Sequence, residues 1–158
     1  MPTDKRSARL RRHRISSSSG HVMRNRLTPL AELEPAPERR GFRLTPSRAP
    51  SGNHGTSPTF NLPVAELWQI WLTVAASQPR TKLLAQDVEQ RRTAHVQRSA
   101  IFRFPDIVRA EIVNIEPRAS SIAIDSQARY GYYDFGVNRR RVLSWLVLVT
   151  EAVQRANA

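Results

Sequence analysis

The sequence contains no cysteine among its 158 residues. A disulfide framework, a catalytic thiol and a cysteine-ligated zinc site are therefore excluded. Histidine is also scarce, and His13, His21, His54 and His95 have no spacing that is typical of metal ligands. We accordingly expect no bound metal and no cofactor.

Long apolar runs are missing as well. A membrane-spanning helix needs about 20 consecutive apolar residues, and the apolar-rich stretch at residues 142–149 is shorter and belongs to an amphipathic pattern. The pair Arg11-Arg12 resembles a twin-arginine export signal, but no apolar segment follows it. We expect a soluble chain with no membrane span and a cytoplasmic location.

Positive charge is concentrated at the N-terminal end. Residues 1–57 hold 12 Lys and Arg against 4 Asp and Glu, whereas residues 58–158 hold 13 against 9. The first segment is rich in Pro, Ser and Arg and cannot bury enough apolar surface to offset the entropy of ordering. We predict a disordered basic tail over residues 1–57 and a single domain over residues 58–158. An organellar transit peptide is a weaker alternative for the tail, and either Met1 or Met23 is the true start.

From Pro58 onward the pattern is that of alternating strands and helices. Apolar residues recur at helical spacing in residues 63–77 and 138–155, which predicts two amphipathic helices. The residues expected on their core faces are Val64, Leu67, Trp68, Trp71, Leu72 and Ala75 in the first, and Val142, Trp145, Leu146, Val149 and Val153 in the second. Strands are predicted at residues 58–61, 82–85, 93–104, 107–115 and 121–129.

This order, β-α-β-β-β-β-α, predicts an α+β fold. We expect an antiparallel sheet of four to five strands with both helices on one face. The same order occurs in helix-grip and TATA-binding-protein-like folds, which is an analogy and does not determine function.

The predicted strand at residues 93–104 alternates between apolar and polar side chains. Ala94, Val96 and Phe102 are expected on its core face, and His95 and Gln97 on its solvent face. Arg98 interrupts the core face, so we expect it to pair with an acid.

The stretch YGYYDFGVNRRRVLSWLV, residues 130–147, leads into the last helix. Asp134 or Asn138 can supply an oxygen that caps the first helical turn. Because Arg139, Arg140 and Arg141 are spread over about 200° of the helix surface, they cannot all face one ligand. We expect Arg141, on the same stripe as Trp145, to be covered and paired.

Three hypotheses account for this strand-to-helix corner. The first is an internal network that holds the last helix against the sheet. The second adds Arg129 to the same residues and makes a binding site for a small anionic ligand. The third is an enzyme that acts on an anionic substrate with Asp106 and Asp134 as paired carboxylates, although no nucleophile with a base lies nearby. The residues concerned are Arg98, Asp106, Arg129, Asp134, Asn138 and Arg141.

Of these functions we favour non-enzymatic binding of a small polar or anionic ligand, or of a protein partner, at the corner. Nucleic acid is a third class of partner. The tail sequence RSARLRRHR can neutralise phosphates but has no aromatic residue for stacking. Tyr130, Tyr132 and Tyr133 beside Arg129 could stack bases, but the neighbouring acids disfavour a nucleic-acid site there. Non-specific nucleic-acid binding through the tail is therefore the third and least favoured hypothesis.

From about Thr56 to Val153 the chain resembles the bacterial and plant family known as domain of unknown function 1499. The resemblance rests on TSPTFNLPVAELWQIW, VQRSAIFRFPD and SQARYGYYDFGVNRRRV. The third segment follows the family pattern S-x-S-R-x-G-x-S-D-[LF]-G-V-N-x-x-R except at Ala128 and Tyr133, where the family has hydroxyl residues. The matching residues are Arg98, Phe102, Phe104, Asp106, Ser126, Arg129, Gly131, Asp134, Phe135, Gly136, Val137, Asn138 and Arg141. The family has no assigned activity, so the resemblance implies a domain and no reaction.

Overall fold

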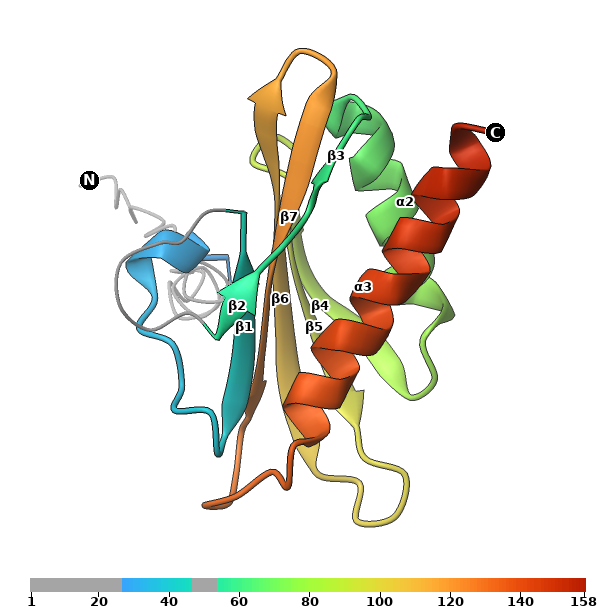
Figure 1. Ribbon diagram of the computed structural model, residues 1–158. Helices are drawn as coiled ribbons and strands as arrows, with labels where there is room; N and C mark the ends of the chain where they lie inside the picture. The colour runs from blue at the N-terminus through green and yellow to red at the C-terminus, as the bar shows by residue number, and fades with distance from the viewer. Residues whose placement is uncertain (1–26, 47–53) are drawn as a thin grey trace, which may run out of the picture.

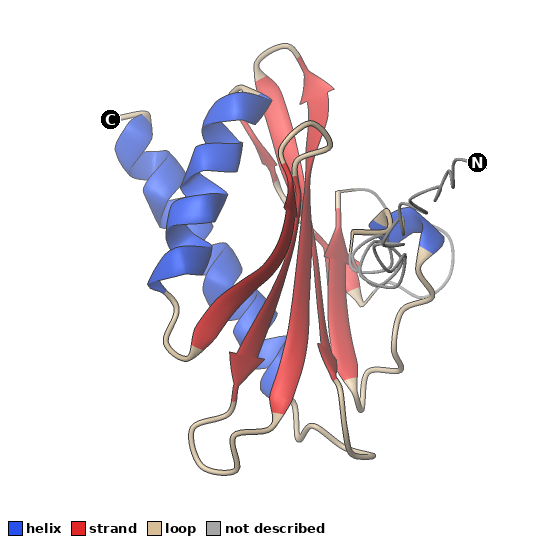
Figure 2. Ribbon diagram, turned by 180° about the vertical axis from the view of Figure 1, so that it is seen from behind, coloured by secondary structure: helices blue, strands red, loops and turns tan. Residues whose placement is uncertain are grey.

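Two helices lie across one face of a seven-stranded sheet (Figures 1 and 2). The computed structural model describes residues 27–46 and 54–158. The elements are η1 (Leu30–Glu32), β1 (Gly41–Thr45), β2 (Gly55–Thr56), β3 (Thr59–Phe60), α2 (Val64–Ser77), β4 (Thr81–Asp87), β5 (Arg92–Arg98), β6 (Pro105–Glu116), β7 (Ala119–Ala128) and α3 (Val137–Ala156). The predicted α+β class is confirmed.

Strands β4 to β7 form the antiparallel meander that the sequence predicts. The sheet has the order β2-β1-β7-β6-β5-β4, and β3 also pairs with β7. Because β6 occupies one edge of β7, both β1 and β3 pair with the other edge, at different heights. The β1 and β2 strands pair in parallel. The predicted count of four to five strands is too low, because β1 and β2 come from the segment predicted as a tail.

The prediction that the domain begins at Pro58 is wrong for the described residues of that segment. Strand β1 pairs with residues 124–127 of β7, and its Phe42 and Leu44 are buried in the core. The five residues GFRLT are too few to show a clear strand period, and their pairing with β7 is a long-range contact that the local sequence does not encode. Residues 1–26 and 47–53 of the predicted tail lie outside the described residues.

Arg43 of β1 joins the chain segment around η1 to the face of the sheet opposite the helices. Its Nε donates to Asp125 Oδ1 at 2.9 Å, and its Nη1 donates to the backbone oxygens of Leu30 and Leu33. The second oxygen of Asp125 accepts from Arg109 Nη1 at 3.4 Å. Arg43 and Asp125 are both almost completely buried, so each depends on the other to compensate its charge.

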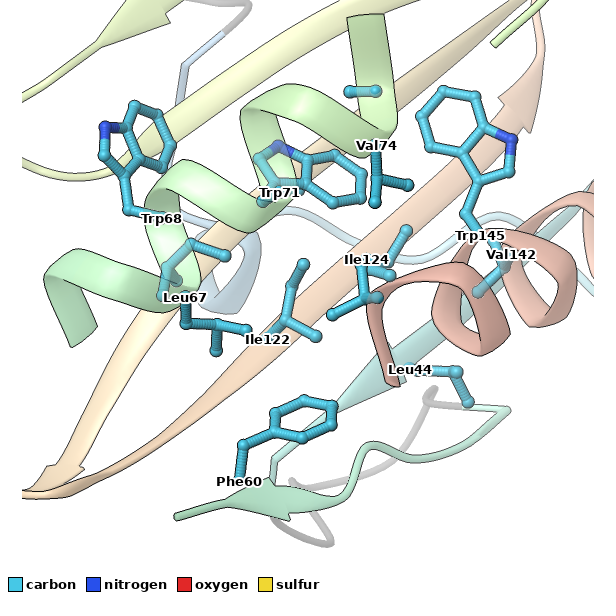
Figure 3. Close-up of a cluster of buried hydrophobic side chains, with 14 of the residues drawn as sticks. Leu44, Phe60, Leu67, Trp68, Trp71, Val74, Ile122, Ile124, Val142 and Trp145 are labelled. Carbon is cyan, nitrogen blue, oxygen red and sulfur yellow. The ribbon is translucent and has the colours of Figure 1, made fainter. Parts of the chain in front are cut away.

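The hydrophobic core lies between the helices and the sheet. Figure 3 shows Leu67 of α2 beside Ile122 of β7, and Ile124 between Ile122 and the α3 side chains Val142 and Trp145. The rings of Trp71 and Trp145 are 5.6 Å apart, centroid to centroid. The predicted core stripes of both helices are confirmed: Leu67, Trp68, Trp71, Ala75, Val142, Trp145, Val149 and Val153 are buried, and Val64, Leu72 and Leu146 are partly buried.

Strand β5 differs from its prediction in length and in orientation. It ends at Arg98, and residues 99–104 form a loop. Its polar face, predicted to meet solvent, is buried under the helices: Trp71 Nε1 donates to Thr93 Oγ1 at 2.9 Å, and His95 lies edge-on to Trp71 and Trp145. Trp71 of α2 and Arg141 of α3 present buried N–H donors to this face, and each donor needs an acceptor on the strand.

His95 gives the domain a predictable dependence on pH. Burial lowers the pKa of His95 from 6.5 to about 4. The unfolded chain therefore binds a proton that the folded chain excludes, so stability present above pH 6.5 is lost as the pH falls toward 4. Between about pH 7.5 and about pH 4.5 we expect a loss of roughly 2–3 kcal/mol from this residue, measured by urea denaturation.

A His95→Phe variant is the control for this prediction. It keeps every other titrating group, including Asp106, whose pKa is shifted in the opposite direction. The variant should lose less stability than the wild type over the same pH range. Equal losses would show that folding does not lower the pKa of His95.

Candidate functional site

Several strand ends meet the start of α3 at one end of the sheet. Strand β5 ends there, β6 begins there, β7 ends there, and two loops complete the connections (Figure 1). We call residues 99–104 and 129–136 the corner loops. They are neighbours, because Arg129 N donates to the backbone oxygen of Pro105 at 3.3 Å.

Arg141 is the centre of a buried network behind the corner loops. Its Nη2 donates to Asp106 Oδ2 at 2.7 Å, and its Nη1 donates to Ser126 Oγ at 3.0 Å and to Asn138 Oδ1 at 2.5 Å. Its Nε donates to Gln97 Oε1. All five side chains are buried. One guanidinium thus connects α3 to β5, β6 and β7.

Asp134 and Asn138 extend this network to the start of α3. Asp134 Oδ2 accepts from the backbone N of Asn138 at 3.1 Å and from its Nδ2 at 2.7 Å, while Oδ1 accepts from Gly136 N at 2.8 Å. Asp134 therefore supplies the capping oxygen, and Asn138 lies inside the helix. Asn138 Nδ2 also donates to the backbone oxygen of Arg40 at 3.4 Å, which links the corner to the segment before β1.

The surroundings of Asp106 shift the pKa of its carboxyl group. Burial raises the pKa of Asp106, and the charge of Asp134 adds to the rise, whereas the guanidinium of Arg141 opposes it. The other acceptor on Arg141, Gln97, is oriented by its own Nε2, which donates to the backbone oxygen of Pro79 at 3.1 Å. Each acceptor of Arg141 is thus held from a separate element of the fold.

The structure brings four of the six residues predicted for the corner together: Asp106, Asp134, Asn138 and Arg141. Arg98 and Arg129 lie outside the network. The expectation that Arg98 pairs with an acid is wrong, since β5 has the opposite orientation and Arg98 is exposed, with Nη1 donating to the backbone oxygen of Arg103 at 3.2 Å. The guanidinium of Arg129 lies over the ring of Tyr130, 5.7 Å from its centroid.

The sequence pattern does not predict that Gln97 and Ser126 belong to the network. Gln97 alternates with apolar residues along its strand, so the pattern predicts it on the solvent face. Ser126 shares a strand face with Ile122 and Ile124, and a polar residue in that register is a signal of a buried partner. Arg141 reaches from α3 to both side chains and donates to each of them, which accounts for these two buried polar residues.

Asp134 provides a testable contribution to stability. An Asp134→Ala variant should lose about 1–3 kcal/mol, because it leaves three donors at the start of α3 without their acceptor. Asp87→Ala is the matched control, since Asp87 Oδ1 accepts from one exposed backbone donor, Gln90 N, at 2.9 Å. Urea denaturation should show a smaller loss for the control. Equal losses would mean that the Asp134 contacts do not stabilise the helix.

Large apolar side chains are exposed on the corner loops. Of the twelve such side chains in the described part of the chain, seven belong to these two loops. Ile101, Phe102 and Phe135 are 82%, 72% and 86% exposed. A monomeric soluble protein seldom exposes so many apolar side chains in one place, and such surfaces usually mark binding sites. The seven residues are Ile101, Phe102, Phe104, Tyr130, Tyr132, Tyr133 and Phe135.

Arginines surround the same loops. In the described part of the chain, no exposed arginine around the corner forms an ion pair. Asp106 and Asp134 are the acids of the corner, and both are buried in the network. Glu38, beside Arg39, is an exposed acid that adjoins these arginines. The surface of this end is therefore both aromatic and cationic. The arginines are Arg39, Arg80, Arg98, Arg103, Arg129, Arg139 and Arg140.

One cavity, of about 350 Å³, is lined by α2 and α3, and another, of about 390 Å³, is lined by α2, β4 and His95 of β5. The described residues contain no cluster of three or more His, Cys, Asp or Glu side chains that could hold a metal ion. In the same residues no helix has the length and apolarity that crossing a membrane requires.

The fold and corner define an α+β domain in which a buried arginine network supports two exposed aromatic loops. The model of a family described as a protein of unknown function (DUF1499) matches residues 43–147, which is more than half of the chain. The chain belongs to this family. The match begins inside β1 and includes the whole network, in agreement with the structural start of the domain before Pro58. A comparison with curated proteins found no match.

Proposed function

We propose that this domain is a non-enzymatic binding module whose contact surface is the pair of corner loops. The observation that carries the proposal is the concentration of exposed aromatic side chains on loops that a buried network holds in place. Binding sites on loops usually consist of exposed side chains that a rigid scaffold of strands and helices holds in position.

Backbone conformation supports the same assignment. Two of the four non-glycine residues with a positive φ in the described chain lie in the corner loops, Arg103 at 57° and Phe135 at 53°, and the other two, Arg80 and Arg91, lie in turns next to β4 and β5. Non-glycine residues are uncommon in this region of conformational space, and strain of this kind is concentrated at functional sites.

The network itself is a support and not the contact surface. Arg141 donates to four protein acceptors, and Asp134 accepts from three protein donors, so neither has its main polar groups free for a ligand. Arg98 and Arg129 are exposed and can contact an anionic group of a partner. A small anionic ligand would therefore bind at these two arginines, outside the network.

Enzymatic activity is not part of the proposal. Asp106 and Asp134, the carboxylates considered for catalysis, both accept hydrogen bonds inside the network. Burial accounts for the raised pKa of Asp106. Turnover of an anionic substrate that is lost in Asp134→Asn, with folding retained, would overturn this conclusion.

A single fluorescent label tests the binding function. Because the chain has no cysteine, Tyr132→Cys and Val88→Cys each carry one thiol for an environment-sensitive dye. Val88 is exposed and lies in the β4–β5 turn at the opposite end of the sheet. The panel consists of phosphate, small carboxylic acids, a single-stranded oligonucleotide and phospholipid vesicles. A saturable change at position 132 and none at position 88 is expected, whereas no change at position 132 with any compound would contradict the proposal.

A further inference from the structure

We infer that the partner of the corner loops is the surface of an anionic phospholipid bilayer. This inference rests on the proposed function and names its partner. It is drawn from the chemistry of the exposed side chains, from the way they protrude and from the charge around them.

The apolar side chains at the loop ends protrude into solvent. Ile101 and Phe102 in one loop and Phe135 in the other are among the most exposed residues of their kind in the described chain. Both loops project at the lower end of the sheet, beside the start of α3 (Figure 1). A protein partner would need a matching hollow for each protruding side chain, whereas the acyl region of a bilayer accepts them without a complementary shape.

The tyrosines are suited to the interfacial region of a bilayer. Tyr130, Tyr132 and Tyr133 combine an apolar ring with a hydroxyl group, and residues of this kind gather at the depth of lipid headgroups. These three residues are 61%, 76% and 63% exposed and lie in the same loop. The loops thus combine fully apolar side chains, suited to the acyl region, with tyrosines, suited to the headgroup region.

The charge around the loops is complementary to anionic lipid. The guanidinium of Arg39 lies over Tyr132 and that of Arg129 over Tyr130, at 5.4 and 5.7 Å from the ring centroids. Neither forms an ion pair with a described residue. When the rings enter the interface, these cations reach the level of the headgroup phosphates and carboxylates.

The same side chains are less suited to single-stranded nucleic acid. Base stacking needs accessible aromatic faces, but Phe102 and Phe104 stack on each other, with centroids 5.7 Å apart and an angle of 22° between their planes. Ile101, which is 82% exposed, has no aromatic face. Lipid is therefore the partner that uses all of the exposed side chains.

Vesicle sedimentation with the full chain tests this inference. The vesicles contain either phosphatidylcholine alone or equal amounts of phosphatidylcholine and phosphatidylserine. A corner variant carries Ile101→Ser, Phe102→Ser and Phe135→Ser, and the matched control carries Val88→Ser, Ile115→Ser and Val147→Ser, which are exposed apolar residues away from the corner loops. Residues 1–26, which contain many arginines, are the same in every protein, so their contribution cancels in the comparison.

The corner variant should partition onto the mixed vesicles at least about tenfold less than the wild type, because it removes the side chains that enter the acyl region. The control should partition as the wild type does. A charge variant with Arg98→Gln, Arg103→Gln and Arg129→Gln should lose binding to mixed vesicles and change little with phosphatidylcholine. All variants should melt at the wild-type temperature, since none of the substituted residues is buried.

Equal partitioning of the corner variant and its control would overturn the inference. So would a corner variant that loses retention of a single-stranded oligonucleotide while its binding to vesicles is unchanged, because nucleic acid would then be the partner. If the label at position 132 responds to another member of the panel and the wild type does not sediment with vesicles, the lipid inference fails and the binding function stands.

Discussion

A chain that begins at Pro58 is expected to lose the cooperative fold. Such a chain lacks β1, whose Phe42 and Leu44 are buried against the helices. Removing a large buried side chain costs about 2–5 kcal/mol, and loss of Arg43 leaves the buried Asp125 with Arg109 as its remaining cation, at 3.4 Å. The sum approaches the roughly 5–15 kcal/mol that stabilises a typical domain. Thermal unfolding followed by circular dichroism should show no cooperative transition for the truncated chain.

Point variants of the full chain separate the contribution of β1 from other effects of truncation. Phe42→Ala and Arg43→Ala should each melt cooperatively at a lower temperature than the wild type. Arg118→Ala, which changes an exposed arginine in the turn between β6 and β7, should have no such effect. A truncated chain that melts like the wild type would show that β1 is not part of the stable domain.

The second large effect is expected for Arg141→Ala, at about 3–5 kcal/mol. The substitution removes the cation that compensates the buried Asp106 and leaves the oxygens of Gln97 and Asn138 without this donor. Urea denaturation at neutral pH measures the loss. Arg140→Ala is the matched control from the next position, because Arg140 is exposed and donates one bond, to the backbone oxygen of Phe135 at 3.1 Å. The control should change stability by about 0.5 kcal/mol or less.

The pH dependence of this variant identifies the cause of the loss. Arg141 holds the pKa of Asp106 down against the effect of burial, so its removal raises that pKa further. A protonated Asp106 needs no cation. The deficit of Arg141→Ala relative to the wild type should therefore shrink as the pH falls. A deficit that is constant with pH would mean that lost packing, and not the unpaired carboxylate, is responsible.

Local patterns predicted the helices well and the sheet edges poorly. Val142, Trp145 and Val149 recur at a spacing that only a helix brings onto one face, so the core stripe of α3 could be read directly. Strand β1 carries no comparable signal, because its stability comes from pairing with β7, which lies about eighty residues further along the chain. For the same reason the tail was predicted too long.

The candidate site was predicted in part. Asp134, Asn138 and Arg141 lie within eight residues of one another, so helix geometry brings them together. Neighbouring residues of a strand lie on opposite faces of the sheet. The pattern predicts the wrong face of β5 as buried, so it points to Arg98 and not to Gln97 as the network residue. The orientation of β5 depends on the indole N–H of Trp71 and on Arg141, which reach Thr93 and Gln97 from the helices.

The sequence by itself determined the α+β class, both amphipathic helices, the meander of β4 to β7 and the family, because each depends on local periodicity or on a contiguous motif. Only the tertiary structure decided which face of β5 is buried, that β1 completes the sheet, and that Asp106 and Asp134 are hidden while the aromatic side chains of the corner loops are exposed. These features depend on contacts between residues far apart in the chain, and the free energy of burying a charge or a ring is set by those contacts and not by its neighbours in sequence.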